Sequence, residues 1–238
     1  MSPMIELIIF TTIAGIAMPV GALIASIEHL RPDWLEREVR HTVIAFGGGV
    51  LLSAVALVLV PDAIDDLSPI PAAIWFIVGG CAFMLLDRAL AASKSSAAQL
   101  VAMLADFIPE AIAMGASYAT GSSTGMLLAL LITLQNLPEG FNAYRELRAS
   151  TKMPAKRIIV AFAAMALLGP ASGLLGFHFL GDRHATIGAL MLFAAGGILY
   201  LTFNDIAPQA KLENRYAPPM GAVTGFLLGL IGHMLVTT

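Results

Sequence analysis

Apolar residues dominate long stretches of this chain, and eight of the stretches approach the length that an α-helix needs to cross a bilayer, about 20 residues. They cover residues 4–27, 41–60, 70–91, 98–119, 123–145, 157–179, 185–205 and 217–236. The connections between them are short, so they leave no room for a folded domain outside the membrane. The pattern predicts an all-α, polytopic integral membrane protein that forms a single transmembrane domain over residues 1–238.

The composition agrees with a membrane protein and narrows its chemistry. Hydrophobic residues make up 58% of the chain and charged residues 12%, whereas soluble domains carry about 25% charged residues. The one cysteine, Cys81, lies inside an apolar stretch and excludes an intramolecular disulfide or a thiolate metal cluster. The net charge of −3 is small, and nothing in the sequence calls for a nucleic-acid partner. The expected surroundings are the lipid bilayer.

Lys and Arg residues are concentrated in alternate connections between the apolar stretches. These connections, or the stretch ends beside them, hold Arg31, Arg37, Arg40, Arg88, Lys94, Arg145, Arg148, Lys152, Lys156, Arg157, Lys211 and Arg215. The other connections hold Arg183 alone. Because positively charged loops stay on the cytoplasmic side, the sequence predicts a multi-pass protein of the cell membrane with both termini outside the cytoplasm.

Two neighbouring stretches contain a similar motif with a glutamate that directly follows a proline. Asp106 precedes Glu110 by four positions, and Gln135 precedes Glu139 by the same distance. Each pair therefore lies on one face of a helix, and the proline loosens the backbone beside the glutamate. A charged carboxylate near the bilayer centre costs roughly 2.5–3.5 kcal/mol. The motifs therefore require a proton, water or a metal ion at this depth.

Related proline motifs close two other stretches. Pro61-Asp62-Ala63 ends the second stretch, and Pro208-Gln209-Ala210 ends the seventh. Alternate crossing of the membrane places these copies at opposite faces, which is the arrangement that an inverted repeat produces. Such repeats place substrate sites near the midplane, beside interrupted helices. We expect a 3+2+3 arrangement of eight helices, with the fourth and fifth at the centre.

The residues of the central pair predict a metal site made of oxygen ligands. Asp106 and Glu110 supply carboxylates from one helix, while Gln135 and Glu139 supply an amide and a carboxylate from its antiparallel neighbour. Asn136 is a further candidate ligand. Oxygen donors suit hard divalent cations, so Zn²⁺, Fe²⁺ or Mn²⁺ are all candidates. The alternative is that the glutamates are protonated and only bridge the helices by hydrogen bonds.

The segment 135–140, QNLPEG, together with 106–110, DFIPE, resembles the signature helices four and five of the ZIP (Zrt/Irt-like) divalent metal transporters. Segments 14–19, 60–63 and 199–205 are similar in kind. The resemblance implies eight helices with both ends outside, uptake of a divalent metal as substrate without a prosthetic group, and a possible homodimer. It also implies that helices one, four, five and six move relative to the others.

The chain departs from the family pattern at several ligand positions. In helix four, Asp106 and Phe107 occupy the positions where the family usually has histidine and asparagine, and in helix five Gln135 occupies the position of the usual histidine. Gly169 stands where a glutamate often precedes a proline in helix six, and Gln209 replaces an acidic residue in helix seven. These departures predict a divergent member with at most one well-formed metal site.

The function that these residues favour is divalent metal transport through a site between helices four and five, by alternating exposure to the two sides of the membrane. A non-transporting paralogue with a structural or regulatory role is the alternative, and the lost ligands at Phe107, Gly169 and Gln209 favour it. An intramembrane enzyme is the third class. The sequence lacks a His-Glu-x-x-His motif and any Ser, Cys or Lys set near the carboxylates, so we expect no enzymatic activity.

Overall fold

The computed structural model describes residues 2–27, 33–93, 98–121, 124–210 and 215–237, and this part of the chain contains no β-strand. Arg31, Lys94 and Lys211, used above to predict the orientation, lie outside these residues. The helices in chain order are α1 (Pro3–Ile27), α2 (Asp33–Ala54), η1 (Val55–Leu59), α3 (Val60–Asp66), α4 (Pro69–Ser93), α5 (Ala98–Thr120), α6 (Thr124–Ser150), α7 (Ala155–Ala166), α8 (Leu168–Leu180), α9 (His184–Leu201), η2 (Thr202–Ile206), α10 (Ala207–Gln209) and α11 (Ala217–Thr237).

Six helical segments of the described chain are long and apolar enough to cross a membrane. They are Pro3–Ile27, Arg37–Asp66, Pro69–Ala92, Ala155–Leu180, His184–Gln209 and Ala217–Val236. Helices α5 and α6 have 23 and 27 residues, which gives lengths of about 35 and 40 Å at 1.5 Å per residue. Both are long enough to cross, but the polar residues of the central motifs lower their hydropathy. The prediction of an all-α polytopic membrane protein is confirmed.

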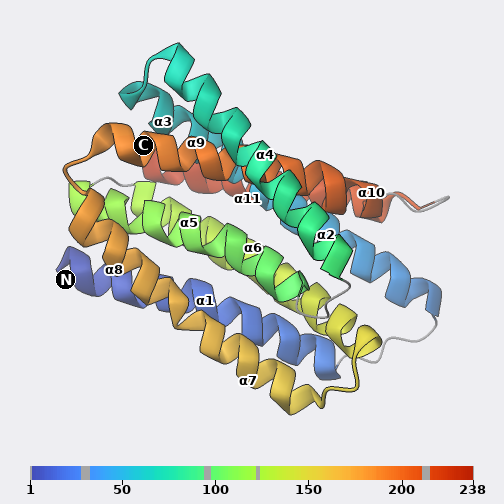
Figure 1. Cartoon of the computed structure of the whole chain (residues 1–238). Helices are drawn as coiled ribbons and strands as arrows, with labels where there is room; N and C mark the ends of the chain where they lie inside the picture. The colour runs from blue at the N-terminus through green and yellow to red at the C-terminus, as the bar shows by residue number, and fades with distance from the viewer. Residues whose placement is uncertain (1, 28–32, 94–97, 122–123, 211–214, 238) are drawn as a thin grey trace.

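The helices form two groups that lie side by side (Figure 1). In the first group α1 packs along α6, and α5 packs along α8, with α7 against α1. In the second, α2 packs along α11 and α4 packs along α9, with α3 beside α9. Contacts between the groups are made chiefly by α2 with α6 and by α5 with α9. The central helices α5 and α6 therefore face the second group across a long seam.

Within each group, paired helices touch backbone to backbone. A Cβ atom added at Gly115 of α5 would overlap the carbonyl oxygen of Gly173 in α8, and one added at Gly49 of α2 would overlap the carbonyl oxygen of Ala222 in α11. Small residues allow this close approach in membranes, where packing rather than hydrophobic transfer holds helices together. The pairs α5/α8 and α2/α11 are therefore tightly packed units.

The two outer proline motifs have the same backbone irregularity. The π-helical turn η1 (Val55–Leu59) ends two residues before Pro61, and the π-helical turn η2 (Thr202–Ile206) ends two residues before Pro208. A proline cannot donate the hydrogen bond that continues an α-helix, and π-turns inside helices are frequent at functional sites. The matching positions of these turns are what the inverted repeat predicts.

The sequence predicted one continuous helix over 157–179, but the structure divides it into α7 and α8 at Leu167. The Leu167 amide donates to the carbonyl oxygen of Ala164 at 3.2 Å. This bond reaches back three residues instead of the four of an α-helix, so it closes a tighter, 3₁₀-type turn. The break precedes Pro170, which has no amide hydrogen to donate to the Ala166 carbonyl. Helix α1 passes this carbonyl closely, since a Cβ added at Gly15 would lie 2.6 Å from its oxygen.

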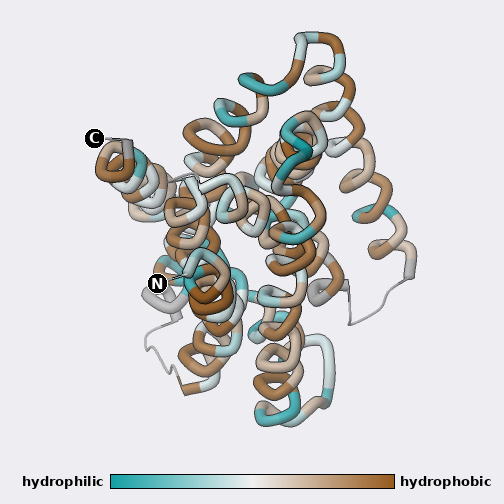
Figure 2. Tube along the Cα trace, turned by 90° about the vertical axis from the view of Figure 1, so that its left-hand side faces the viewer, coloured by the Kyte–Doolittle hydropathy of each residue, from teal (hydrophilic) through white to brown (hydrophobic). Residues whose placement is uncertain are grey.

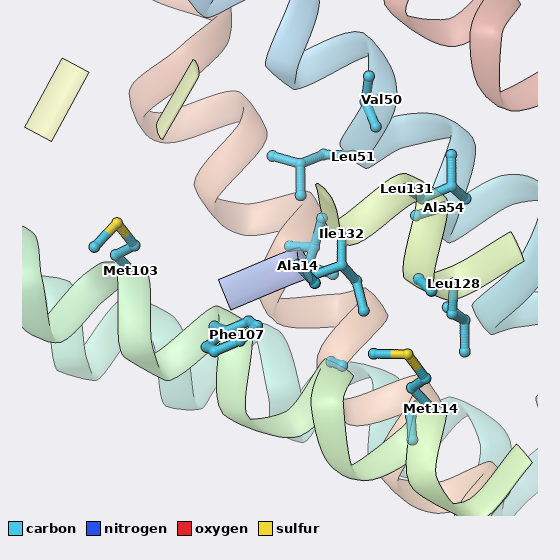
Figure 3. Packing of buried hydrophobic residues seen from close by; sticks show 14 of the residues in the cluster. Ala14, Val50, Leu51, Ala54, Met103, Phe107, Met114, Leu128, Leu131 and Ile132 are labelled. Atoms are coloured by element: carbon cyan, nitrogen blue, oxygen red, sulfur yellow. The ribbon is translucent and has the colours of Figure 1, made fainter. Parts of the chain in front are cut away.

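Apolar side chains fill the space between α2, α5 and α6 (Figure 3). Leu51 of α2, Phe107 of α5 and Ile132 of α6 are at most 2% exposed. The outer surface is also apolar: residues such as Ile74 of α4 are more than half exposed, and Figure 2 shows hydrophobic residues along most of the length of the helices. A surface of this kind fits lipid rather than water.

The first turn of α1 and the last turn of α11 lie at the same end of the molecule, at the left of Figure 1, while the last turn of α1 and the α6–α7 connection lie at the opposite end. An even number of crossings produces this arrangement. The second end carries Glu38 and Arg215, whose side chains form an ion pair at 3.4 Å. We call it the basic end, because the described residues there include Arg148, Lys152 and Arg215.

Candidate metal centre

The central polar residues come from the middle of α5 and α6, and a hydrogen bond joins the two helices there. The Gln135 amide nitrogen donates to Oε2 of Glu110 at 2.6 Å. Pro109 and Pro138 lie inside these helices, so the backbone beside each glutamate has lost one α-helical hydrogen bond. The amide of one motif therefore lies directly against the carboxylate of the other.

Most of this polar cluster is hidden from solvent. Asp106, Glu110 and Gln135 are 4%, 1% and 0% exposed, whereas Glu139 is only partly buried. Asp106 is close enough to interact electrostatically with both Glu110 and Glu139. Within the described residues none of the three carboxylates has a Lys or Arg ion-pair partner. Like charges at this burial require a proton or a cation between them.

Three buried oxygen atoms of the cluster have no hydrogen-bond donor. They are Oδ1 of Asp106, Oε1 of Gln135 and Oδ1 of Asn136. Buried acceptors are nearly always paired in folded proteins, and an unpaired carboxylate or amide oxygen is also a good ligand for a hard cation. The donor chemistry of the site therefore fits a divalent metal ion.

The five predicted ligands do not converge into a closed cage in this conformation. Among the described residues, no group of three or more His, Cys, Asp or Glu side chains is placed to hold a metal ion. Glu110 is turned toward the Gln135 amide. Asn136 uses its amide nitrogen in a 2.9 Å bond to the carbonyl oxygen of Ala14, which ties α6 to α1. Only the side-chain oxygen of Asn136 is available as a ligand.

Asp106 and Glu139 line a cavity of about 460 Å³ at the seam between the two helix groups. Glu146, Asp87 and Asp205 add three carboxylates to its wall, which is formed by α2, α4, α5, α6 and the α9–η2 segment. Glu146 follows Glu139 by two helical turns toward the basic end. The cavity therefore leads from the central cluster toward that end, while Glu110 and Gln135 lie deeper and outside its lining.

A hydrogen-bonded group that includes Asp87 and Asp205 of the cavity wall was missed in part by the sequence analysis. The Tyr200 hydroxyl donates to Oδ2 of Asp87 at 3.0 Å, and the Asn204 amide donates to the same oxygen at 3.3 Å. The Asn204 amide also donates to Oδ1 of Asp205 at 2.8 Å. Segment 199–205 was noted in the sequence, whereas Asp87 was overlooked. The signal for Asp87 was an isolated carboxylate within an apolar stretch.

Two of the positions that lack the family's ligands, Phe107 and Gly169, are in direct contact. Phe107 is 1% exposed, and a Cβ atom added at Gly169 would lie 2.7 Å from Cζ of its ring. The same Cβ would lie 2.7 Å from the carbonyl oxygen of Thr11. The Phe107 ring of α5 therefore packs against Gly169 of α8. This apolar contact lies next to Asp106, the neighbour of Phe107 in the chain.

In the described part of the chain, membrane-crossing helices enclose carboxylates that have no Lys or Arg ion-pair partner. An acidic cavity extends from these carboxylates toward the basic end. These features define a polytopic membrane protein suited to admit cations. A family model described as ZIP zinc transporter matches residues 95–237, which is more than half of the chain. The protein belongs to the ZIP family, as the sequence motifs predicted.

Curated proteins of related sequence are zinc transporters by name. Zinc transporter zipt-7.1 of Caenorhabditis briggsae is 30% identical over 112 residues, which cover 45% of this chain and 29% of that protein. Zinc transporter SLC39A7 of Homo sapiens is 29% identical over 157 residues, which cover 63% of this chain and 33% of the relative. The mouse protein of the same name is 29% identical over 143 residues, or 58% and 30% of the two chains. The chain thus spans about a third of the length of these relatives.

Proposed function

We propose that this protein carries a divalent metal ion across the membrane, with Zn²⁺ as the first candidate. The observation that carries the proposal is Asp106, a buried carboxylate with an unpaired oxygen at the deep end of an acidic cavity. Membership of a family whose curated members are named zinc transporters supports the same reaction. Fe²⁺ and Mn²⁺ are alternative substrates, because the ligands are all oxygen atoms.

The ion moves along carboxylates of increasing burial. Glu146 and Asp205 in the cavity wall concentrate cations, and Asp106 with Glu139 binds the ion at the deep end. Glu110 is the next ligand inward. A half-turn of the Gln135 amide group would exchange its nitrogen for its unpaired oxygen, so that Gln135 and Glu110 could both face a cation. Asn136 contributes its free oxygen to the same site.

Access to the site alternates between the two sides of the membrane. The acidic cavity gives access from the basic end. On the other side of Glu110, Met114 of α5 and Leu128 and Ile132 of α6 are at most 1% exposed and pack together (Figure 3). Opening that side requires the helix group of α1, α5, α6, α7 and α8 to shift against the other group. The tight backbone contacts inside each group favour such a movement of whole groups.

The setting of the transporter follows from the basic connections and the family resemblance. We infer that the basic end faces the cytoplasm, that both termini face outward at the cell membrane, and that the metal moves inward. A homodimer is the proposed assembly. No step of this scheme uses covalent chemistry, so an enzymatic role has no support from these residues.

The second candidate function is a non-transporting membrane protein of the same fold. The Phe107–Gly169 contact favours it, because two positions that hold ligands in the family here form apolar packing. Such a protein would sense or hold a metal ion without moving it. The acidic cavity serves either function, because an ion that is only sensed also needs a polar path to Asp106, so uptake of the ion decides between the two.

The test is uptake of Zn²⁺, Mn²⁺, Fe²⁺, Co²⁺ and Cd²⁺ into proteoliposomes. We expect uptake of at least one ion by the unchanged protein and a loss of at least ten-fold in Asp106→Asn and in Glu110→Gln. Asp65→Asn is the matched control, because Asp65 is an exposed carboxylate at the end of α3. Metal binding by folded protein without uptake of any ion would favour the second function. Unchanged uptake in both variants would contradict the proposed site.

A further inference from the structure

A second cavity lies beside the acidic one, and Pro138 of α6 lines both. It has a volume of about 420 Å³ and runs between the pair α1/α6 and the pair α2/α11. Ile24 of α1, Val43 and Phe46 of α2, and Leu137 and Phe141 of α6 form most of its apolar wall. We call this cavity the apolar groove. Its volume is within the range of about 300–1,000 Å³ that is usual for ligand sites.

The groove offers hydrocarbon surface and no free hydrogen-bonding side chain. Its polar side chains are Thr42 of α2 and Thr224 of α11. The Thr42 hydroxyl donates to the carbonyl oxygen of Glu38 at 2.6 Å, and the Thr224 hydroxyl donates to that of Gly221 at 2.8 Å. Both hydroxyl groups are thus used within their own helices. Water has no partners in such a space, so a filled groove requires an apolar occupant.

The groove opens to the bilayer near the basic end of the molecule. Ile24 and Leu137 at its edge are 42% and 36% exposed on the membrane-facing surface. Thr42 stands one helical turn from Glu38, about 6 Å along the axis of α2, and Glu38 belongs to the ion pair at the basic end. Arg145, one turn beyond the groove residue Phe141 toward the basic end of α6, places its guanidinium 5.6 Å from the centre of the Phe141 ring. A lipid phosphate near Arg145 would therefore have its chains level with the groove.

We propose that the apolar groove binds one acyl chain of a phospholipid from the leaflet at the basic end. The chain lies between the two helix groups and contacts Pro138, which lines both the groove and the acidic cavity and directly precedes Glu139. Because both helix groups contribute walls, the bound chain stabilises the arrangement in which the acidic cavity is open at the basic end. A ligand shifts a conformational equilibrium only through such a difference in affinity.

The first test is photolabelling of the detergent-solubilised protein with a phosphatidylglycerol that carries a diazirine in one acyl chain. We expect labelling of peptides that contain Ile24 or Val43 to saturate as the probe concentration rises. Labelling of peptides around Ile74 on α4, which is 53% exposed on the outer surface, should rise in proportion to the probe. Equal, unsaturated labelling at both places would overturn the proposal.

A variant that fills the groove provides the second test. Val43→Phe projects a larger side chain into the groove, and Val223→Phe is the control because Val223 is 55% exposed on α11 and lies outside the groove lining. We expect Val43→Phe to lower the saturable labelling at least ten-fold and Val223→Phe to leave it unchanged. Normal labelling in Val43→Phe would count against the groove.

A diazirine-labelled free fatty acid separates the phospholipid from the simplest competing occupant. Saturable labelling of the groove by the fatty acid alone, without labelling by the phosphatidylglycerol probe, would overturn the proposal in favour of a fatty-acid site. If Val43→Phe fails to fold, the concentration dependence in the unchanged protein decides alone. Neither measurement depends on metal transport, so the proposal can fail or hold independently of the proposed function.

Discussion

The contact between Phe107 and Gly169 can be measured as a coupling energy. In Gly169→Ala the new methyl group would lie 2.7 Å from Cζ and 3.3 Å from Cε1 of the Phe107 ring, and 2.7 Å from the carbonyl oxygen of Thr11. Overpacking of this kind costs about 1–3 kcal/mol. Phe107→Ala removes a ring that is 1% exposed, for which about 3 kcal/mol is expected, the lower end of the usual range.

The two substitutions compensate in the double variant. Without the ring, the methyl group at position 169 loses its clash with Phe107 and occupies part of the vacated space, while its contact with the Thr11 carbonyl persists. We therefore expect Phe107→Ala/Gly169→Ala to be more stable than the sum of the single effects by about 1 kcal/mol or more, within the range found for residues in contact.

The assay is reversible unfolding in mixed detergent micelles, followed by circular dichroism as the proportion of sodium dodecyl sulfate rises. Gly80→Ala combined with Phe107→Ala is the control, because a Cβ at Gly80 would make an ordinary 3.4 Å contact with α9 and would not touch Phe107. That pair should be additive. If the effects of the Phe107 and Gly169 substitutions add within about 0.5 kcal/mol, the two residues are not energetically coupled, and the reasoning from their contact is refuted.

Three further predictions concern helix packing and metal content. Gly79→Ala should destabilise the protein by about 1–3 kcal/mol more than Gly80→Ala, because a Cβ at Gly79 would overlap the Phe193 carbonyl oxygen. Equal midpoints of detergent unfolding for the two variants would contradict this expectation. Asn136→Leu should cost about 0.6–1.7 kcal/mol, since it removes the bond from α6 to the Ala14 carbonyl, and the same unfolding assay measures it. Elemental analysis after equilibration with Zn²⁺ should give about one tightly bound ion per chain that is lost in Asp106→Asn, because the Phe107–Gly169 contact leaves no second set of ligands; two ions of equal affinity would contradict the single site.

The helices were predictable from the sequence because membrane crossing imposes a simple constraint on composition and length. The predicted stretch 98–119 corresponds to α5 (Ala98–Thr120), and 217–236 corresponds to α11 (Ala217–Thr237). The second helix differs most, since it begins at Asp33 and continues through η1 and α3 to Asp66, well beyond the predicted 41–60. Its added turns are polar, so hydropathy alone could not assign them to a helix that extends past the membrane.

The central motif was predictable in composition but not in detail. Spacing by four positions placed Asp106 with Glu110 and Gln135 with Glu139, yet it could not tell that the Gln135 amide donates to Glu110. Side-chain direction depends on how α5 and α6 are rotated, which is set by contacts with α8 and α1 far away in the sequence. The role of Asp87 in the cavity wall depends on the same packing.

In the proposed transport scheme, the three central carboxylates occupy different positions along the path of the ion. Glu139 is partly buried and lines the cavity, Asp106 is buried and also lines the cavity, and Glu110 is buried against an amide donor. Each of the three is close enough to the other two to interact electrostatically. An ion in the cavity can therefore meet Asp106 and Glu139 without any change of shape, whereas reaching Glu110 requires the Gln135 amide to turn. The Gln135 amide occupies the place at Glu110 that a cation would take, because it donates a hydrogen bond to that carboxylate. An arriving cation must therefore replace this hydrogen bond before Glu110 can bind it. Asp106 is the most buried carboxylate of the cavity wall, and under the proposed scheme its loss should impair transport even where Glu110 is intact.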